Sequence, residues 1–273
     1  MELTETENIV KENISIQSKY LKRLVVVDLF LPPDVEVLND VNLLLINDGQ
    51  DMPVMNFRKI LEGLYLKQAI NPIICVAVSC SNQRMMEYGV AGKADYLGRG
   101  AKATMYSKFI IKELLPFLKK KFHKIKFTEI GFAGFSLGGL SALDIVWNNP
   151  KVFSIAGIFS GSLWWRSKDQ QDVNYQDNKH RIMQQAIRKG QYVSGMKFFF
   201  QTGKLDEIAD RNGNGVIDAV EDTMDHIHEL INKGYSPKDI YYLELEDGRH
   251  DVPSWGRAMP EFLRWAWGRK TGS

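Results

Sequence analysis

The chain has 273 residues, enough for one large domain with a sizeable buried core. Hydrophobic residues make up 44% of it and charged residues 25%, the composition of an ordinary soluble globular protein. The net charge is only +2, and the Lys and Arg residues are scattered apart from Lys119 to Lys121. Because a nucleic-acid-binding surface needs a concentration of positive charge, we expect no nucleic-acid partner.

The N-terminal segment MELTETENIVKEN is acidic and does not place positive charge before an apolar core, so we predict no signal peptide. No run of 18 apolar residues occurs, so we predict no membrane-spanning segment. We therefore expect a cytoplasmic protein without a membrane partner. Since no repeat, low-complexity segment or linker is present, we also predict a single domain over residues 1–273. The oligomeric state is not indicated.

Apolar runs and turn residues predict alternating strands and helices along the chain. The first half predicts strands at 9–20, 22–31, 41–46 and 72–79, and helices at 56–69 and 105–122, the latter kinked or restarted at Pro116. The second half predicts a short strand from Ile130 to residues 134–138 and a helix from there to Asn149, further strands at 154–159, 196–201 and 239–245, and helices at 178–189, 220–233 and 255–267. This alternation predicts an α/β fold, with a mostly parallel central sheet, antiparallel N-terminal edge strands and helices on both faces.

The rest of the chain is organised around residues 130–149, IGFAGFSLGGLSALDIVWNN, which contain a G-x-S-x-G pattern at 134–138. In a nucleophile elbow the turn is so tight that the positions two before and two after the serine must lack a side chain. The serine hydroxyl is then exposed above the edge of the sheet. Because a predicted strand and helix flank the pattern, we interpret Ser136 as a nucleophile rather than as a serine in an ordinary glycine-rich turn.

A neutral serine is a poor nucleophile and needs a general base within hydrogen-bond reach. Among the five histidines, His226 and His228 fall in a predicted helix, His123 at a lysine-rich helix end and His180 in a polar stretch. We expect those four side chains to be solvated. His250 follows the last predicted strand, at the carboxyl end where ligands collect in parallel sheets. We predict that His250 is the base.

The acid that orients this base should lie between serine and histidine in the chain. The residues T-G-K-L-D-E at 202–207 follow a predicted strand, again at its carboxyl end. We predict Asp206 as the acid and keep Glu207 as the alternative. Asp251 is a poorer candidate, because the side chain of a residue adjacent to the base usually points elsewhere.

Stabilising a tetrahedral oxyanion requires two hydrogen-bond donors. The backbone N–H of Leu137 directly follows the predicted nucleophile and lies at a helix N-terminus, where the helix dipole also helps. We expect the second donor from the loop after the third strand, NDGQ at 47–50, with the backbone N–H of Gln50 as our choice.

A second motif at residues 210–221, DRNGNGVIDAVE, matches each constrained position of the twelve-residue calcium loop. The predicted oxygen ligands are Asp210, Asn212, Asn214, the Val216 carbonyl, Asp218 and Glu221. Gly215 would provide the sharp turn. No helix is predicted directly before the loop, so the motif is not a complete EF-hand. We predict an insertion that binds structural calcium and steadies the loop of Asp206, with a polar loop free of metal as the alternative.

The sequence resembles the putative esterase family of α/β-hydrolases, which includes esterase D, enterochelin esterases and feruloyl esterases. The resemblance covers nearly the whole chain. Its specific pieces are NDGQ at 47–50, GFSLGG at 134–139, SGSLWW at 160–165, and GRHD at 248–251 with Trp255 five residues beyond the histidine. It implies an α/β-hydrolase fold, a triad of Ser136, His250 and Asp206, and hydrolysis of carboxylic esters through an acyl-enzyme without a cofactor.

Several aromatic and basic residues are candidates for contacting the substrate. Trp164 and Trp165 either wall an aromatic pocket or anchor the core. Arg84, Tyr96 and Arg99 lie in a long polar segment after the fourth strand, where they either recognise a carboxylate or phenolate or form local ion pairs.

We therefore predict a serine esterase that acts on a small or medium ester, with aromatic and catecholate esters as the favoured class. Acyl transfer to an acceptor other than water is an alternative, because the same triad supports it. A non-catalytic calcium-binding module with a vestigial triad is another, and the intact set of serine, histidine, acid and oxyanion loop argues against it. The substrate itself is not specified.

Overall fold

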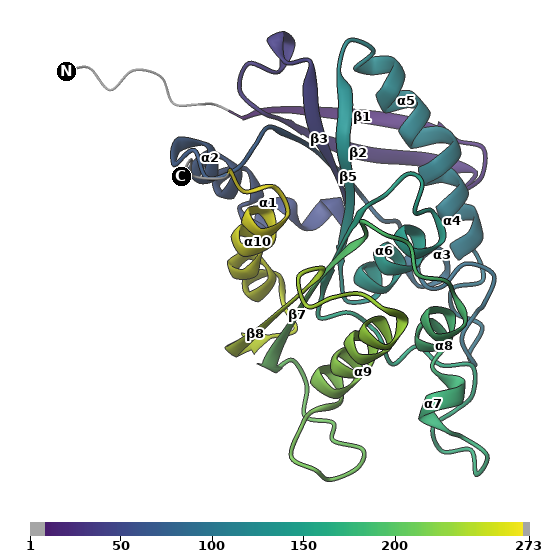
Figure 1. Cartoon of the computed structure of the whole chain (residues 1–273). Helices are drawn as coiled ribbons and strands as arrows, with labels where there is room; N and C mark the ends of the chain where they lie inside the picture. Colours follow the sequence, from purple (N-terminus) through teal and green to yellow (C-terminus); the bar gives the residue numbers. More distant parts are fainter. Residues whose placement is uncertain (1–8, 270–273) are drawn as a thin grey trace.

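The fold is built on a sheet of eight strands, which the computed structural model, describing residues 9–269, arranges in the order β1-β2-β4-β3-β5-β6-β7-β8 (Figure 1). The strands are β1 (Val10–Ser18), β2 (Arg23–Leu31), β3 (Asp40–Asn47), β4 (Ile73–Val78), β5 (Lys126–Phe135), β6 (Ile155–Phe159), β7 (Lys197–Leu205) and β8 (Ile240–Arg249). The strands from β4 to β8 in this order are parallel, whereas β1 and β2 are antiparallel to their neighbours. The predicted α/β-hydrolase fold with antiparallel N-terminal edge strands is confirmed.

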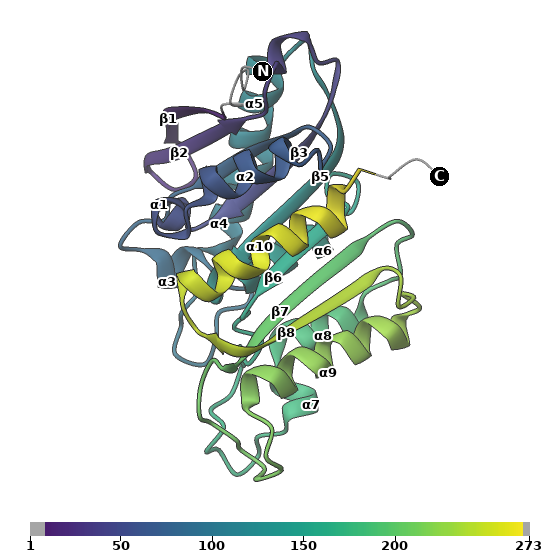
Figure 2. The same cartoon turned by 90° about the vertical axis from the view of Figure 1, so that its left-hand side faces the viewer.

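Helices cover both faces of this sheet (Figures 1 and 2). The helices are α1 (Met52–Met55), α2 (Phe57–Leu66), α3 (Arg84–Glu87), α4 (Ala103–Phe109), α5 (Leu115–Lys121), α6 (Leu137–Asn148), α7 (Asp177–His180), α8 (Ile182–Lys189), α9 (Asp218–Lys233) and α10 (Val252–Trp267). Helices α1, α2 and α10 pack on one face and share a core that includes Leu61 and Phe262. Helices α4, α5, α6, α8 and α9 lie on the other face, where Leu140 and Phe198 belong to a second core.

One predicted helix is preceded by a separate short helix, and another is divided. The helix expected at 56–69 is preceded by the separate α1, because Asn56 adopts a left-handed conformation with φ 56° between α1 and α2. The helix expected at 105–122 consists of α4, a π-helical turn at Ile110–Leu114 and α5, with Pro116 in the first turn of α5. Proline cannot donate the backbone hydrogen bond of a helix interior, so Pro116 starts a new turn as expected.

Strands β7 and β8 are longer than the sequence pattern predicted, and this difference determines the geometry of the site. We expected them to end at residues 201 and 245, but they run to Leu205 and Arg249, which are paired beyond a register shift. Glycines permit this extension: a Cβ on Gly203 would lie 2.3 Å from the backbone of Gly248. Residues 202–205 and 246–249, which we expected in loops, therefore belong to the sheet.

None of the helices within residues 9–269 is long and apolar enough to cross a membrane. Most of the acidic N-terminal segment on which we based the absence of a signal peptide lies outside these described residues. The single-domain organisation stays a prediction.

Candidate active site

The candidate residues lie at the carboxyl ends of parallel strands. Strand β5 ends beside Ser136, β7 beside Asp206 and β8 beside His250, while the NDGQ segment begins at the end of β3. In the sheet, β3 and β6 flank β5, and β7 and β8 follow β6. Because parallel strands end at the same edge of a sheet, the fold brings these four segments to one rim.

Ser136 occupies a strained turn between β5 and α6. Its φ is 53° and its ψ −123°, a conformation that residues with a side chain rarely adopt. A Cβ on Gly134 would lie 2.2 Å from the Gly138 carbonyl oxygen, and one on Gly138 would lie 2.6 Å from a carboxylate oxygen of Asp48. The two flanking glycines are thus a steric requirement of this turn, which leaves the Ser136 side chain half-buried at the rim.

The loop after β3 packs directly against the start of α6. The Asn47 side chain donates a hydrogen bond of 2.7 Å to the Gly138 carbonyl oxygen. Leu137 is the first residue of α6, and Gln50 lies in a 3-10 turn at Gly49–Asp51. The N–H groups of a first helical turn have no acceptor within the helix. The two segments that carry the predicted oxyanion donors are therefore in contact.

Asp206 and His250 are brought together by the pairing of Leu205 with Arg249, because each directly follows one of these paired residues. They line a cavity of about 290 Å³. The other residues lining it are Ser160, Gly161, Ser162, Trp164, Glu207 and Ala219. No hydrogen bond joins His250 to Asp206 or Ser136 within the described chain. Catalytic hydrogen bonds are often long in a ligand-free enzyme and tighten when substrate binds.

The pKa shifts of this pair follow from burial and from their mutual attraction. Burial raises the pKa of Asp206, while contact with the Ser160 hydroxyl and the charge of His250 act in the opposite direction. Burial lowers the pKa of His250, the charge of Asp206 raises it, and Arg84 lowers it further. The net shift of His250 is downward, so its neutral, proton-accepting form persists to lower pH than that of an ordinary histidine.

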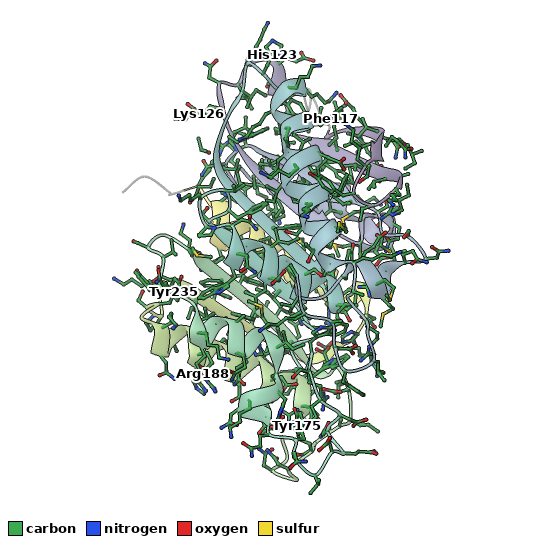
Figure 3. The ribbon with its side chains drawn as sticks, turned by 90° about the vertical axis from the view of Figure 1, so that its right-hand side faces the viewer. Phe117, His123, Lys126, Tyr175, Arg188 and Tyr235 are labelled. Atoms are coloured by element: carbon green, nitrogen blue, oxygen red, sulfur yellow. The ribbon has the colours of Figure 1, made fainter. Side chains whose placement is uncertain are left out.

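The competing histidines have other surroundings. His226 is fully buried, so our expectation of a solvated side chain was wrong, and its Nδ1 lies 2.7 Å from the Asp222 carbonyl oxygen. Burial lowers its pKa to about 4. His123 follows α5 and precedes β5, at the end of the molecule opposite Tyr175, as Figure 3 shows. His123 therefore lies near the amino end of β5, whereas Ser136 follows the carboxyl end of the same strand.

The competing acids also point elsewhere. Asp251 caps α10 by accepting a hydrogen bond of 2.9 Å from the Ser254 N–H. Burial raises the pKa of Glu207, and the nearby backbone N–H of Ala219, in the first turn of α9, acts in the opposite direction. Glu207 therefore faces α9, although it lines the same cavity as Asp206.

Two serines of the SGSLWW segment belong to the site and were not singled out from the sequence. The Ser162 hydroxyl oxygen lies 3.4 Å from that of Ser136, and the Ser162 N–H donates to the Ser136 carbonyl oxygen at 3.0 Å. Ser160 has a positive φ of 43° and accepts a hydrogen bond of 2.9 Å from the Trp255 indole. Their position directly after a strand, at the same rim as the elbow, was the available signal.

The two adjacent tryptophans divide between the two roles we considered. Trp165 is fully buried against Gly89 and Gly100, so it anchors the segment after β4. Trp164 is half-buried and lines the cavity. The Arg99 guanidinium lies over both rings, 5.1 Å and 5.2 Å from their centres. Cations over indole rings are attracted by the π-electrons, so Arg99 steadies both side chains.

The three polar candidates after β4 have local partners. Arg84 forms two hydrogen bonds of 2.8 Å with the buried carboxylate of Asp48, and Arg99 is paired with Asp95. Tyr96 is 39% exposed. The ion-pair interpretation therefore describes both arginines in the ligand-free chain, and Arg84 also acts on the site through its charge near His250.

The predicted calcium loop forms a compact turn between Asp206 and α9. The Asp210 carboxylate accepts hydrogen bonds from three backbone N–H groups of the loop, which lower its pKa. The side-chain amides of Asn212 and Asn214 both donate to the same oxygen of Glu221, at 2.7 Å and 2.9 Å. Four predicted ligand residues thus belong to one hydrogen-bonded cluster.

The donor set suits Ca²⁺ in type, because all predicted ligands offer oxygen once the two amide groups turn over. Within residues 9–269, however, no group of three or more His, Cys, Asp and Glu side chains is arranged to hold a metal ion. Arg211 contacts both Asp218 and Glu221, at 3.4 Å and 3.3 Å. A bound Ca²⁺ would therefore compete with the Arg211 guanidinium for these two carboxylates.

The strand order together with the elbow defines an α/β-hydrolase. The chain belongs to the putative esterase family, whose model matches residues 18–266. A comparison with curated protein sequences gave no significant match.

Solved structures with this fold include several esterases. The enterobactin esterase FES from Shigella flexneri, in the presence of enterobactin, is 20% identical with a TM-score of 0.72, over 94% of this chain and 58% of its own. An IroE-like serine hydrolase from Shewanella oneidensis is 18% identical with a TM-score of 0.72, covering 94% and 80%. The siderophore hydrolase EstB from Aspergillus nidulans is 17% identical with a TM-score of 0.69, covering 93% and 94%. The chain thus spans about 60% of the length of the FES chain.

The elbow geometry predicts that Gly134→Ala is severely destabilising, by roughly 3 kcal/mol or more, because a Cβ would meet the backbone of Gly138. Gly63→Ala is the matched control. Nothing lies within 4 Å of a Cβ at this position inside α2, and alanine is expected to stabilise the helix by up to about 1 kcal/mol. Urea unfolding of the three proteins measures both changes. Equal midpoints for Gly134→Ala and wild type would contradict the steric argument.

The electrostatics predict that the His250 pKa lies below 6.5 and falls further in Asp206→Asn. Removing the carboxylate removes an attraction that favours the protonated imidazole. Glu207→Gln is the control, since Glu207 lies in the same cavity without a comparable effect on His250. NMR titration of the imidazole gives the three values. A larger fall in Glu207→Gln than in Asp206→Asn would identify Glu207 as the partner instead.

Proposed function

We propose that this chain is a serine carboxylic-ester hydrolase that acts through an acyl-enzyme on a small or medium ester. Membership of the putative esterase family supports ester hydrolysis. The observation that carries the serine mechanism is the arrangement at the rim, where an elbow presents Ser136 and the paired ends of β7 and β8 carry Asp206 and His250. The cytoplasmic location stays a prediction.

In the first half of the reaction, the Ser136 hydroxyl attacks the ester carbonyl while His250 accepts the hydroxyl proton. The Asp206 carboxylate stabilises the imidazolium that forms. His250 then gives the proton to the departing alcohol, leaving the acyl group on Ser136. In the second half, water attacks the acyl-enzyme, and His250 again accepts and returns the proton. No cofactor is needed for these steps.

The oxyanion formed in each half is held by the backbone N–H groups of Leu137 and Gln50. Packing of the loop after β3 against α6, through the hydrogen bond from Asn47 to Gly138, supports this assignment. Donors fixed in this way need no reorganisation when the charge develops, and one such donor contributes about 3 kcal/mol to catalysis in other hydrolases.

We propose aromatic esters, including catecholates, as the favoured substrate class. Trp164 lines the cavity beside His250, and its ring lies beneath the Arg99 guanidinium, 5.1 Å away. A flat indole face suits the stacking of an aromatic acyl group. The solved structures with this fold include an enterobactin esterase, a siderophore hydrolase and a ferulic acid esterase, and their names agree with that class.

Ser136→Ala is the direct test. Removing the nucleophile should lower the turnover of a p-nitrophenyl ester by about 10⁶-fold, because no covalent intermediate can form. Ser162→Ala is the matched control, since its hydroxyl lies 3.4 Å from that of Ser136 but is not the proposed nucleophile. Mass spectrometry after rapid quenching should detect the acyl group on Ser136 only.

Unchanged turnover in Ser136→Ala would eliminate the proposed nucleophile. The same assay with added alcohols separates hydrolysis from acyl transfer, because a transferase would form the new ester in preference to the free acid. Feruloyl esters and iron-free catechol siderophores then test the substrate class.

We further propose that residues 210–221 bind Ca²⁺ as a structural ion that steadies the segment carrying Asp206. The agreement of the sequence with the calcium-loop pattern supports this, as does the clustering of Asp210, Asn212, Asn214 and Glu221 side chains. The Asp218 N–H donates to the Ala209 carbonyl oxygen at 2.8 Å and closes the loop on itself. An ion there would link α9, which contacts Glu207, to the acid segment.

Chelator should therefore lower the melting temperature and the esterase activity together, and added Ca²⁺ should restore both. Free Ca²⁺ at 100 times its dissociation constant would stabilise the folded protein by about 2.7 kcal/mol. Glu221→Gln should abolish the response, whereas Glu229→Gln, in the same helix but paired with Arg188, should retain it. Differential scanning calorimetry measures these responses. A melting temperature that changes with neither chelator nor Ca²⁺ would contradict the calcium proposal and would leave the esterase proposal unaffected.

A further inference from the structure

We propose that Trp255, on α10, is a positioning residue that fixes the three catalytic segments relative to one another. The inference rests on the proposed serine esterase mechanism. Trp255 is 7% exposed and does not line the cavity, so its role differs from that of a substrate contact.

The first contact is with the segment of the nucleophile. The Trp255 ring stacks on Phe135, with ring centres 5.2 Å apart and an interplanar angle of 22°. Phe135 is the last residue of β5 and directly precedes Ser136. Phe135 in turn contacts Phe159, at the end of β6, at 5.3 Å. The indole thus supports the strand ends on which the elbow is built.

The second contact is with the base. The rings of Trp255 and His250 meet edge to face, with centres 5.4 Å apart and an angle of 81°. His250 has no hydrogen bond within the described chain to fix its ring, so packing against the indole restricts the orientations available to it. Edge-to-face aromatic pairs contribute beyond their buried area, which favours one orientation of the imidazole.

The third contact reaches the acid through a hydroxyl. The Trp255 Nε1–H donates to the Ser160 oxygen at 2.9 Å. Ser160 and Asp206 line the same cavity, and the Ser160 hydroxyl acts to lower the pKa of Asp206, whereas neither Asp206 oxygen has a partner of regular hydrogen-bond geometry within residues 9–269. A hydroxyl that accepts a hydrogen bond becomes a better donor, so the indole strengthens the interaction of Ser160 with the carboxylate.

These three contacts assign different roles to the ring and to the N–H of Trp255. The ring holds Phe135 and His250, and the N–H holds Ser160. Substituting Trp255→Phe retains an aromatic ring, and it removes the donor together with part of the indole volume. Ser160→Ala removes the acceptor and its link to Asp206. If the two side chains act through their shared hydrogen bond, the double variant should be no worse than Ser160→Ala alone.

Trp267→Phe is the matched control. Trp267 is in the same helix and is 2% exposed, and its Nε1 has no hydrogen-bond partner within residues 9–269. Replacing it removes a similar volume from the same core without removing a hydrogen bond. Any effect that Trp255→Phe shares with Trp267→Phe is therefore an effect of packing.

We expect Trp255→Phe to lower kcat by about five- to tenfold with KM within twofold, which is roughly the effect of losing one hydrogen bond. Trp255→Phe and Ser160→Ala should both raise the pKa of Asp206, because each weakens an interaction that favours its charged form. Carbon-13 NMR of the labelled carboxyl measures this pKa. His250 and Asp251, the charged groups that act on Asp206, are unchanged in these variants.

A kcat, KM and Asp206 pKa in Trp255→Phe that match those of Trp267→Phe would overturn the inference. Additive losses in the double variant would overturn the hydrogen-bond route. The carboxyl pKa is read without substrate, so it decides the role of Trp255 even if the wild-type chain hydrolyses no ester, an outcome that would instead overturn the proposed function.

Discussion

The structure depends on the close approach of two backbone segments at the nucleophile turn. The carbonyl of Gly138 lies where a Cβ of residue 134 would be, and Asp48, in the loop after the neighbouring strand β3, lies against residue 138. Strand β5, helix α6 and the loop after β3 can approach so closely only because both positions lack side chains. The positive φ of Ser136 follows from the same turn. Most of the chemistry proposed for this chain requires that strained serine to keep its position while the surrounding loops supply base, acid and donors.

A second constraint is the pairing of β7 with β8, and β7 lies two strands away from β5 in the sheet. The extension of β7 and β8 to Leu205 and Arg249 replaces two flexible loops with paired backbone, so Asp206 and His250 leave the sheet side by side. The pKa shifts of Asp206 and His250 follow from their partly buried position at the rim of the sheet. Burial disfavours the charged form of each group, and their attraction for one another offsets part of that cost. His250 therefore stays neutral to lower pH than an ordinary histidine, and the Ser160 hydroxyl favours the charged form of Asp206.

The periphery of the site is held by ion pairs and aromatic contacts. Arg84 pairs with the buried Asp48 in the loop after β3, and Arg99 lies over the two tryptophans of the segment after β6. Asp222 of α9 binds both Arg181 and Arg211, which ties the candidate calcium loop to α8. Helix α10 supplies Trp255 from the opposite face of the sheet. The rim is therefore supported from both helical layers.

The sequence by itself determined the fold class and the elbow, because apolar periodicity and a G-x-S-x-G turn between strand and helix are local properties. It also selected His250 and Asp206 as candidates from their places after strands. Only the tertiary structure decided that β7 and β8 continue to those residues, since pairing through Gly203 and Gly248 is a contact between distant segments. The burial of His226, the inward position of Trp165 and the roles of Ser160 and Ser162 were likewise fixed by packing. Local sequence patterns cannot specify which distant residues a side chain contacts. These tertiary contacts determine its burial, its pKa and its orientation.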